Sequence, residues 1–354
     1  VFFFFAPPPT PGTCVREKPP PPGGPHQNPP PGPRPPAPRH TAELLGLLHP
    51  KVLTGERLRH ISDEALPARA LQTDIFAEVE PNQKERLIRA LQRAGNVVGY
   101  IGDGINDASA LRAADAGVSV DSAVDVAREA ADMVLLEKNL DVLRAGILEG
   151  RKTYLNTLKY IFITTSANFG NMFSLAGISL VLPFLPLLPQ QILLLNFLSD
   201  IPALGIAGDR VDEEQLARPK RWNVQLIRRF MVVFGIQSSL FDYLTFTLLL
   251  LVFKVNEAHF QTGWFLESVL TELTVLLIIR TTRPFFKSKP SRFLIWASVA
   301  VATVVVALPY LPIGKMLGFD SLPPSLLAGM IGIAMFYAVM VEVSKGIFFK
   351  RVSL

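Results

Sequence analysis

Carboxylates, an amide and glycines lie together in the string Gly102-Asp103-Gly104-Ile105-Asn106-Asp107, directly after the apolar run Val97 to Ile101. The apolar run predicts a buried strand, and a carboxylate just past the carboxyl end of a parallel strand lies where open α/β sheets bind ligands. Flanking glycines let the backbone approach a phosphate or a hydrated Mg²⁺. Asp103 is therefore a candidate Mg²⁺ ligand, although Gly-Asp-Gly alone is also typical of a plain strand-to-helix turn.

A second set of polar side chains lies in long apolar stretches. Asn168 and Asn171 are three residues apart and share one face of a predicted helix. Asn196 and Asp200 are four residues apart and share a face of the next helix, where Pro202 leaves a backbone carbonyl without its helical donor. These oxygens suit a hard cation such as Mg²⁺ or Ca²⁺. Hydrogen bonding between helices is the alternative role for the asparagines.

Two further carboxylates, Asp242 and Glu267, also fall inside apolar stretches. Charged side chains are costly inside a membrane and are candidates for function by default. Both roles stay open for this pair: ligands of a transported ion, or hydrogen-bond partners between helices. Cys14 is the only cysteine, so neither a disulfide framework nor a thiolate metal cluster is available.

The string Gly102 to Asp107 must be positioned by a soluble α/β segment, which we place at residues 41–138. Short apolar runs such as Ile75 to Val79 alternate there with charged helical stretches such as Gln83 to Arg93, as in a parallel sheet covered by helices. Residues 139–159 then predict one amphipathic helix that leads into the membrane.

The polar residues of the apolar stretches must be positioned by membrane helices. With 49% hydrophobic and 18% charged residues, the chain combines a soluble and a membrane part. Basic residues cluster in the loops that follow the second and fourth spans, which places those loops and both termini in the cytoplasm. The predicted spans number six, at about 160–182, 190–208, 229–253, 263–280, 292–309 and 325–345.

The first 40 residues contain 16 of the 30 prolines and predict a disordered segment, because such a composition cannot bury enough apolar surface to fold. The net charge of +5 does not indicate nucleic-acid binding, since the basic residues from residue 209 onward lie beside apolar runs, as in cytoplasmic membrane loops. The expected partners are membrane lipid and a divalent cation, with no nucleic acid.

Together with Ala108 and Ala110-Leu111, the string Gly102 to Asp107 resembles the hinge signature of P-type ATPases, with Ser109 where that family usually has proline. The segment Phe76 to Lys84 resembles the family stretch whose lysine neutralises an aspartyl phosphate. The resemblance implies a partial phosphorylation domain of haloacid-dehalogenase-like α/β fold, followed by an all-α six-helix transmembrane bundle. It also implies ATP and Mg²⁺ as cofactors of the intact protein, with Lys84, Asp103, Asn106 and Asp107 in the catalytic region.

In the apolar half, Asn196 to Asp200 with Pro202-Ala203 looks like the ion motif shared by calcium and magnesium pumps. The strings Ala217 to Trp222, Ser238 to Asp242 and Phe260 to Phe265 resemble the bacterial magnesium-translocating subfamily. The resemblance covers about residues 50 to 354 and implies a multi-pass protein of the cell membrane that transports a divalent cation through Asn168, Asn171, Asn196 and Asp200.

The Asp-Lys-Thr-Gly-Thr string that carries the phosphorylated aspartate in this family does not occur among the 354 residues. We therefore expect the polypeptide by itself to be inactive as an ATPase. Three alternatives remain beside the magnesium pump: a pump for calcium or another cation, a membrane-tethered phosphatase of the same fold, and a non-catalytic membrane remnant or regulator.

Overall fold

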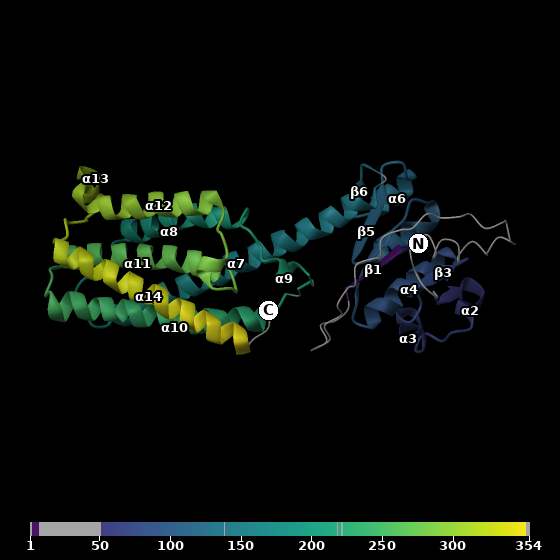
Figure 1. The fold of residues 1–354 in the computed structure, drawn as a ribbon, viewed down its shortest axis with the longest axis horizontal. Helices are drawn as coiled ribbons and strands as arrows, with labels where there is room; N and C mark the ends of the chain where they lie inside the picture. The colour runs from purple at the N-terminus through teal and green to yellow at the C-terminus, as the bar shows by residue number, and fades with distance from the viewer. Residues whose placement is uncertain (1, 7–50, 138, 218, 221, 352–354) are drawn as a thin grey trace, which may run out of the picture. The chain divides into compact units, whose positions relative to one another are not determined.

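The computed structural model describes residues 2–6, 51–137, 139–217, 219–220 and 222–351 (Figure 1). The chain divides into two compact units, Val1–Ala145 and Gly146–Leu354. The predicted boundary near residue 138 lies close to this division, and each unit is described separately below.

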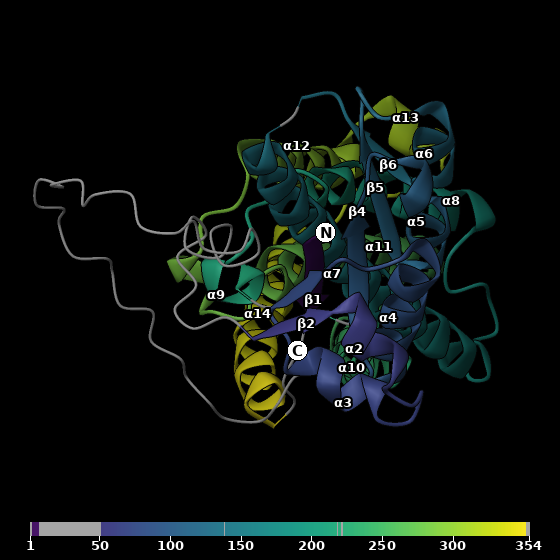
Figure 2. The ribbon, with the colours of Figure 1, turned by 90° about the vertical axis from the view of Figure 1, so that its right-hand side faces the viewer.

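The first unit contains a four-stranded sheet in the order β1-β4-β5-β6. Strands β4 (Val97–Ile101), β5 (Ala116–Val120) and β6 (Met133–Leu135) are parallel, as the alternation of strand and helix predicts (Figure 2). A separate parallel pair joins β2 (Val52–Thr54) to β3 (Ile75–Ala77). The parallel strands therefore form two sheets rather than one continuous sheet.

The prediction of disorder over residues 1–40 is wrong for Phe2–Ala6, which form strand β1, antiparallel to β4. Four consecutive phenylalanines have a high strand propensity, and pairing with β4 satisfies backbone groups that an open sheet edge would leave unpaired. The remainder of that segment, residues 1 and 7–40, lies outside the described residues.

Helix α4 (Pro81–Arg93) has 13 residues and packs against β4 in the first unit. Pro81 occupies its first turn, and the Gln83 side chain accepts a hydrogen bond from the Glu80 backbone amide at 3.1 Å, which completes a capping box. Its buried face packs into the core of the unit through Leu87, Ile88 and Leu91. Shorter helices complete the unit: α2 (Gly55–Arg59), α3 (Leu66–Leu71), α5 (Ala108–Ala113) and α6 (Asp125–Ala130).

The second unit is helical, and α11 (Glu257–Ile279) is its most buried long helix. This helix packs against α8, α10, α12 and α14 (Figure 1). The helices are α7 (Leu140–Ser179), α8 (Pro189–Ala203), α9 (Glu213–Leu216), α10 (Val224–Thr247, continued by a π-helical turn Leu248–Val252), α11, α12 (Arg292–Ala307), α13 (Pro312–Met316) and α14 (Pro324–Arg351).

Among the described residues, four helices are long and apolar enough to cross a membrane: Val224–Val252, Glu257–Ile279, Arg292–Tyr310 and Pro324–Arg351. They coincide with the last four predicted spans. The first predicted span forms the second half of α7, whose first half is charged, and α8 has only 15 residues. The number of six spans and the cytoplasmic position of the termini stay predictions.

Helices α7 and α10 approach each other closely at Gly170 and Gly235. A Cβ atom added to Gly170 would lie 3.1 Å from the carbonyl oxygen of Gly235, and the Ser239 hydroxyl donates a hydrogen bond to the carbonyl of Gly170 at 3.0 Å. Small residues permit this approach in a membrane bundle. The contact fixes the segment of α7 that carries Asn168 and Asn171.

Candidate functional site

In the first unit, Asp107 lies at the centre of a polar cluster just beyond the carboxyl end of β4. One carboxylate oxygen accepts a hydrogen bond from Lys84 Nζ at 2.7 Å, and it also accepts one from the hydroxyl of Tyr100. The other oxygen accepts one from the backbone amide of Gly104 at 3.2 Å. The structure therefore brings two of the predicted catalytic residues, Lys84 and Asp107, into an ion pair.

Glycine is required at position 102 because the chain turns tightly around Asp107. A Cβ atom on Gly102 would lie 2.5 Å from the Cβ of Asp107 and 3.0 Å from the ring of Tyr100. The Ser119 hydroxyl donates to the Gly102 carbonyl at 2.9 Å, which ties the turn to the neighbouring strand β5. The turn is thus held from both sides.

The electrostatics of this cluster favour a charged Asp107. Burial raises the pKa of its carboxyl, but the hydrogen bonds from Lys84, Tyr100 and Gly104 outweigh burial and hold the pKa below its usual value. Burial, together with the hydrogen bond to Asp107, raises the pKa of Tyr100, which therefore remains a neutral donor. Lys84 and Asp107 form a charge-assisted pair that is largely shielded from solvent.

Asp103 and Asn106 are exposed, whereas Asp107 of the same string is buried. No cluster of three or more His, Cys, Asp or Glu side chains suited to a metal occurs within the described ranges. Asp103 therefore offers a single carboxylate, which fits a Mg²⁺ ion whose remaining ligands are water and substrate phosphate. Asp103 and Lys84 remain a proposed metal ligand and a proposed phosphate partner.

In the second unit, a cavity of about 280 Å³ opens between α7, α8 and α11. Three of the four residues predicted to bind the transported ion line it: Asn168, Asn196 and Asp200. All three are exposed. The structure therefore brings the predicted polar faces of the first two spans together around one open space.

Asn171, the fourth predicted residue, does not line this cavity but is hydrogen-bonded to a residue that does. Its amide donates a hydrogen bond to Glu272 Oε1 of α11 at 2.6 Å, and Glu272 itself lines the cavity. Sequence reasoning missed Glu272. The rule that selected Glu267, a carboxylate within an apolar stretch, applies equally to Glu272 and would have found it.

Asp242 and Glu267 do not line this cavity and are almost completely buried. Asp242 accepts hydrogen bonds from the Ser174 hydroxyl of α7 at 2.6 Å and from the Trp264 indole of α11 at 2.9 Å. The Asp242 carboxyl thus connects three helices, which is the geometry of an interhelical hydrogen-bond partner.

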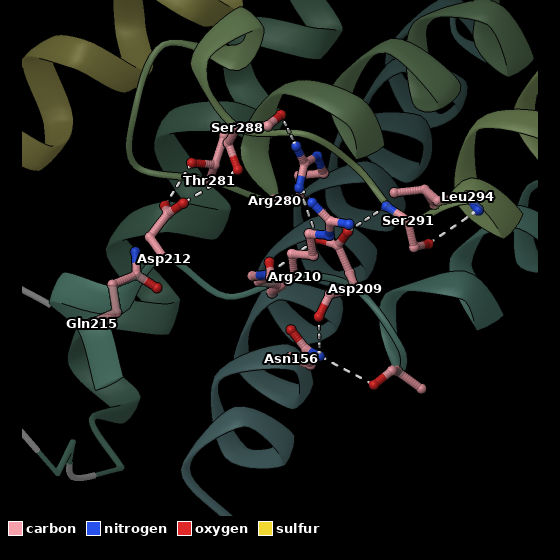
Figure 3. Close-up of polar contacts among 12 residues, drawn as sticks. Asn156, Asp209, Arg210, Asp212, Gln215, Arg280, Thr281, Ser288, Ser291 and Leu294 are labelled. Atoms are coloured by element: carbon pink, nitrogen blue, oxygen red, sulfur yellow. Dashed lines mark hydrogen bonds and ion pairs between the residues drawn. The ribbon is translucent and has the colours of Figure 1, made fainter. Parts of the chain in front are cut away.

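Past the end of α8, a buried ionic cluster surrounds Asp209 (Figure 3). Its carboxylate accepts hydrogen bonds from Lys159 at 3.2 Å, from Arg280 at 3.0 Å and from the backbone amide of Ser291 at 3.0 Å. Asn156 donates to the Asp209 carbonyl at 3.0 Å. Asp209 therefore ties α7 to the end of α11 and to the start of α12.

The adjacent Asp212 accepts hydrogen bonds from neutral groups, the hydroxyls of Thr281 at 2.7 Å and Ser288 at 3.2 Å (Figure 3). This cluster was not anticipated from the sequence. Its members are far apart along the chain, and the sequence pattern marks Arg280 only as one of the basic residues that follow the fourth predicted span.

Comparisons with known proteins give matches for segments of both units. Residues 184–347 match the family described as the C-terminus of cation transporting ATPases, and residues 32–115 match the haloacid dehalogenase-like hydrolases. A "Magnesium-transporting ATPase, P-type 1" of Salmonella typhimurium is 46% identical over 312 residues, which cover 87% of this chain and 35% of that protein.

The protein of the same name from Escherichia coli K12 is 45% identical over 312 residues, with the same coverage. A calcium-transporting ATPase of Bacillus subtilis is 30% identical over 306 residues, covering 79% of this chain and 34% of that protein. The chain thus spans about a third of the length of the curated relatives it matches. It belongs to the P-type ATPase family, in which it is similar to the C-terminal part of the magnesium-transporting members.

Proposed function

We propose that this chain provides the cation-binding helices and the hinge region of an ATP-driven magnesium pump of the cell membrane. The observation that carries the proposal is the cavity in which Asn168, Asn196 and Asp200 meet Glu272. Two carboxylates and two amides provide only oxygen ligands, which suits a hard divalent cation. The 46% identity to a magnesium-transporting relative favours Mg²⁺ over Ca²⁺.

The size of the cavity supports a partly hydrated cation. Its volume of about 280 Å³ is many times the space that a single water molecule needs, about 10–15 Å³. Mg²⁺ loses its water ligands reluctantly and usually keeps several of them in protein sites. The open side of the cavity leaves space for this water, so direct ligation by Asp200 and Glu272 is compatible with a largely hydrated ion.

The first unit supports a role in phosphoryl transfer within the intact pump. The Lys84 ammonium is a compact charge suited to a phosphoryl oxygen, and Asp107, itself held by Tyr100 and Gly104, orients it. When bound, Mg²⁺ would neutralise phosphate charge next to Asp103. In this proposal, the residues of this chain bind and orient the phosphoryl group. The Asp-Lys-Thr-Gly-Thr string, which carries the nucleophile in this family, is not among the 354 residues.

Cation binding can be tested on the chain itself. We expect the protein purified in detergent to bind Mg²⁺ in calorimetric titration, and Asp200→Asn to weaken binding at least about tenfold, or about 1.4 kcal/mol. Glu149→Gln is the matched control, because Glu149 is an exposed carboxylate of the same unit with its side chain 69% accessible. Equal affinity of wild type and Asp200→Asn would refute the site. Stronger binding of Ca²⁺ than of Mg²⁺ would identify the chain as part of a calcium pump.

The lack of independent ATPase chemistry needs a separate test. We expect this polypeptide to form no acid-stable phosphoenzyme with labelled ATP, because the phosphorylated string of the family is not among its 354 residues. Hydroxylamine-sensitive label on the purified chain would show that another aspartate is phosphorylated and that the polypeptide is catalytically competent.

A further inference from the structure

The cavity lined by Asn168, Asn196 and Asp200 continues into a second, much smaller cavity. The two cavities share Asn168 of α7 and Asn196 of α8 as lining residues. Their volumes are about 280 Å³ and about 30 Å³, and they are called the wide cavity and the narrow cavity below. A single water molecule needs about 10–15 Å³. A Mg²⁺ ion that keeps its water ligands therefore fits the wide cavity but not the narrow one.

The two cavities follow each other along the helices. Each of α7, α8 and α11 lines the wide cavity with one stretch and the narrow cavity with the adjacent stretch. The stretches for the wide cavity fall within residues 160–168, 196–203 and 272–276, and those for the narrow cavity within 168–175, 192–196 and 264–268. The cavities therefore lie end to end, with Asn168 and Asn196 between them.

Apolar side chains line most of the narrow cavity. They are Met172 and Leu175 of α7, Ile192 and Leu195 of α8, and Leu187 in the turn before α8. Leu187 and Leu195 are 6% and 4% exposed. Apolar constrictions of this kind exclude water and hydrated ions. The narrow cavity is therefore a barrier at one end of the wide cavity.

One buried hydroxyl lies in this apolar wall without a partner. Ser268 of α11 lines the narrow cavity and is 1% exposed, and its Oγ forms no hydrogen bond within the described residues. The hydroxyls of Thr262 and Thr271 on the same helix instead donate to the carbonyls of Ala258 and Glu267, at 2.7 and 2.9 Å. Because a buried hydroxyl without a partner costs free energy, Ser268 is a ready contact for a polar group that enters the narrow cavity.

A hydrogen bond joins the walls of the two cavities. Asn171 lines the narrow cavity, and its amide donates at 2.6 Å to Oε1 of Glu272, which lines the wide cavity. A cation bound by Glu272 competes with Asn171 for this carboxylate. Occupancy of the wide cavity is thereby linked to the wall of the narrow cavity.

We propose that the narrow cavity is the closed continuation of the cation path, with Leu195 in its apolar barrier and Ser268 as a contact for the passing cation or its water. This proposal rests on the proposed cation site in the wide cavity. Passage beyond Asn168 and Asn196 requires that the apolar side chains separate and admit water. The Ser268 hydroxyl then gains the partner that it lacks in the closed arrangement.

The barrier can be tested by Mg²⁺ entry into lipid vesicles that contain the purified chain and a fluorescent Mg²⁺ indicator. Leu195→Asn places an amide in the apolar wall and should increase the entry rate at least about fivefold over wild type, because a hydrated constriction conducts. Leu193→Asn is the matched control, since Leu193 of the same helix is 72% exposed and lines neither cavity. Equal entry rates of wild type and Leu195→Asn overturn the proposal.

A double substitution distinguishes passage through the two cavities from a leak through damaged protein. Leu195→Asn combined with Asp200→Asn should return Mg²⁺ entry close to the wild-type rate, because the wide cavity then lacks the Asp200 carboxylate. Entry that persists in the double variant, when Asp200→Asn alone weakens Mg²⁺ binding, bypasses the cation site and overturns the path.

The contact by Ser268 is tested in the same Leu195→Asn background. Ser268→Ala should slow Mg²⁺ entry several-fold, whereas Ser268→Thr keeps the hydroxyl and should not. Ser298→Ala is the control, because the Ser298 hydroxyl is also buried without a partner among the described residues but lines neither cavity. Equal entry with Ser268→Ala and Ser298→Ala overturns the role of Ser268.

Failure of the proposed function gives a different result. If calorimetric titration shows equal Mg²⁺ affinity of wild type and Asp200→Asn, the cation site in the wide cavity is refuted. The comparison of Leu195→Asn with Leu193→Asn then still decides whether the narrow cavity is a barrier to Mg²⁺.

Discussion

Asp209 and Arg280 form an ion pair at 3.0 Å in which both side chains are fully buried. Lys159 of α7 shares the same carboxylate at 3.2 Å. Because all three charges are removed from water, each depends on the others for compensation. Along the chain, Arg280 follows Leu276 and Asp209 follows Ala203, two residues that line the cavity, so the pair fixes one end of that cavity.

Replacing Asp209 by Asn should therefore destabilise the helical unit strongly. Removal of one partner from a buried ion pair typically costs about 3–5 kcal/mol, because the remaining charges stay buried without compensation. We expect a clear decrease in the temperature at which the detergent-solubilised protein loses its monodisperse elution profile.

Two substitutions provide matched controls for Asp209→Asn. Asp212→Asn should be milder, since its partners Thr281 and Ser288 are neutral donors. Glu214→Gln should have little effect, because its pair with Arg283 is largely exposed. Equal melting temperatures of Asp209→Asn and Glu214→Gln would show that the buried cluster does not stabilise the fold.

Glu272 should contribute to cation affinity through its charge. Glu272→Gln retains an oxygen that can accept the hydrogen bond from Asn171, but it removes a negative charge from the cavity. We expect at least about a tenfold loss of Mg²⁺ affinity in calorimetric titration. Unchanged affinity in Glu272→Gln, with Asn171→Ala equally silent, would show that the Asn171–Glu272 contact serves only helix packing.

The Asp107 cluster should make the first unit sensitive to acid. Since the folded-state pKa of Asp107 is below its usual value, the pair with Lys84 contributes stability above that usual value, about 3.9, and the contribution is lost as the pH falls through the folded-state pKa. Hydrogen exchange of residues 97–113 should therefore accelerate on acidification beyond the intrinsic pH dependence.

Asp107→Asn tests this assignment. It should accelerate exchange of the same segment at neutral pH by roughly tenfold or more, as expected for the loss of a hydrogen-bonded charge worth about 1.5–3 kcal/mol. It should also remove the additional acid sensitivity. Asp121→Asn is the control, because the Asp121 carboxylate is exposed and lies 3.9 Å from the Arg128 guanidinium. Retained acid sensitivity in Asp107→Asn would contradict the assignment.

The six predicted spans place Gln190 and Lys220 on opposite sides of the membrane. With Cys14 replaced by serine, single cysteines at the two positions should react with an impermeant thiol reagent from opposite sides of oriented vesicles. Labelling from the same side would contradict the predicted crossing by α8. The four long apolar helices alone do not decide this point, because α7 and α8 precede them.

The sequence by itself determined the elements and most of the polar residues. The apolar run before Gly102 predicted strand β4, helical spacing paired Asn168 with Asn171 and Asn196 with Asp200, and the strings shared with P-type ATPases indicated the family. These features depend on spacing within one segment, which local backbone geometry fixes. The strand formed by Phe2–Ala6 escaped prediction because its partner β4 is about 95 residues away along the chain.

Only the tertiary structure decided which distant side chains meet. Lys84 contacts Asp107 rather than the exposed Asp103, and Asn171 is hydrogen-bonded to Glu272, which lies 101 residues further along the chain. Asp209 likewise is paired with Arg280 across 71 residues. Such contacts depend on how helices rotate and pack against each other, and close packing at positions such as Gly170 and Gly235 fixes that rotation.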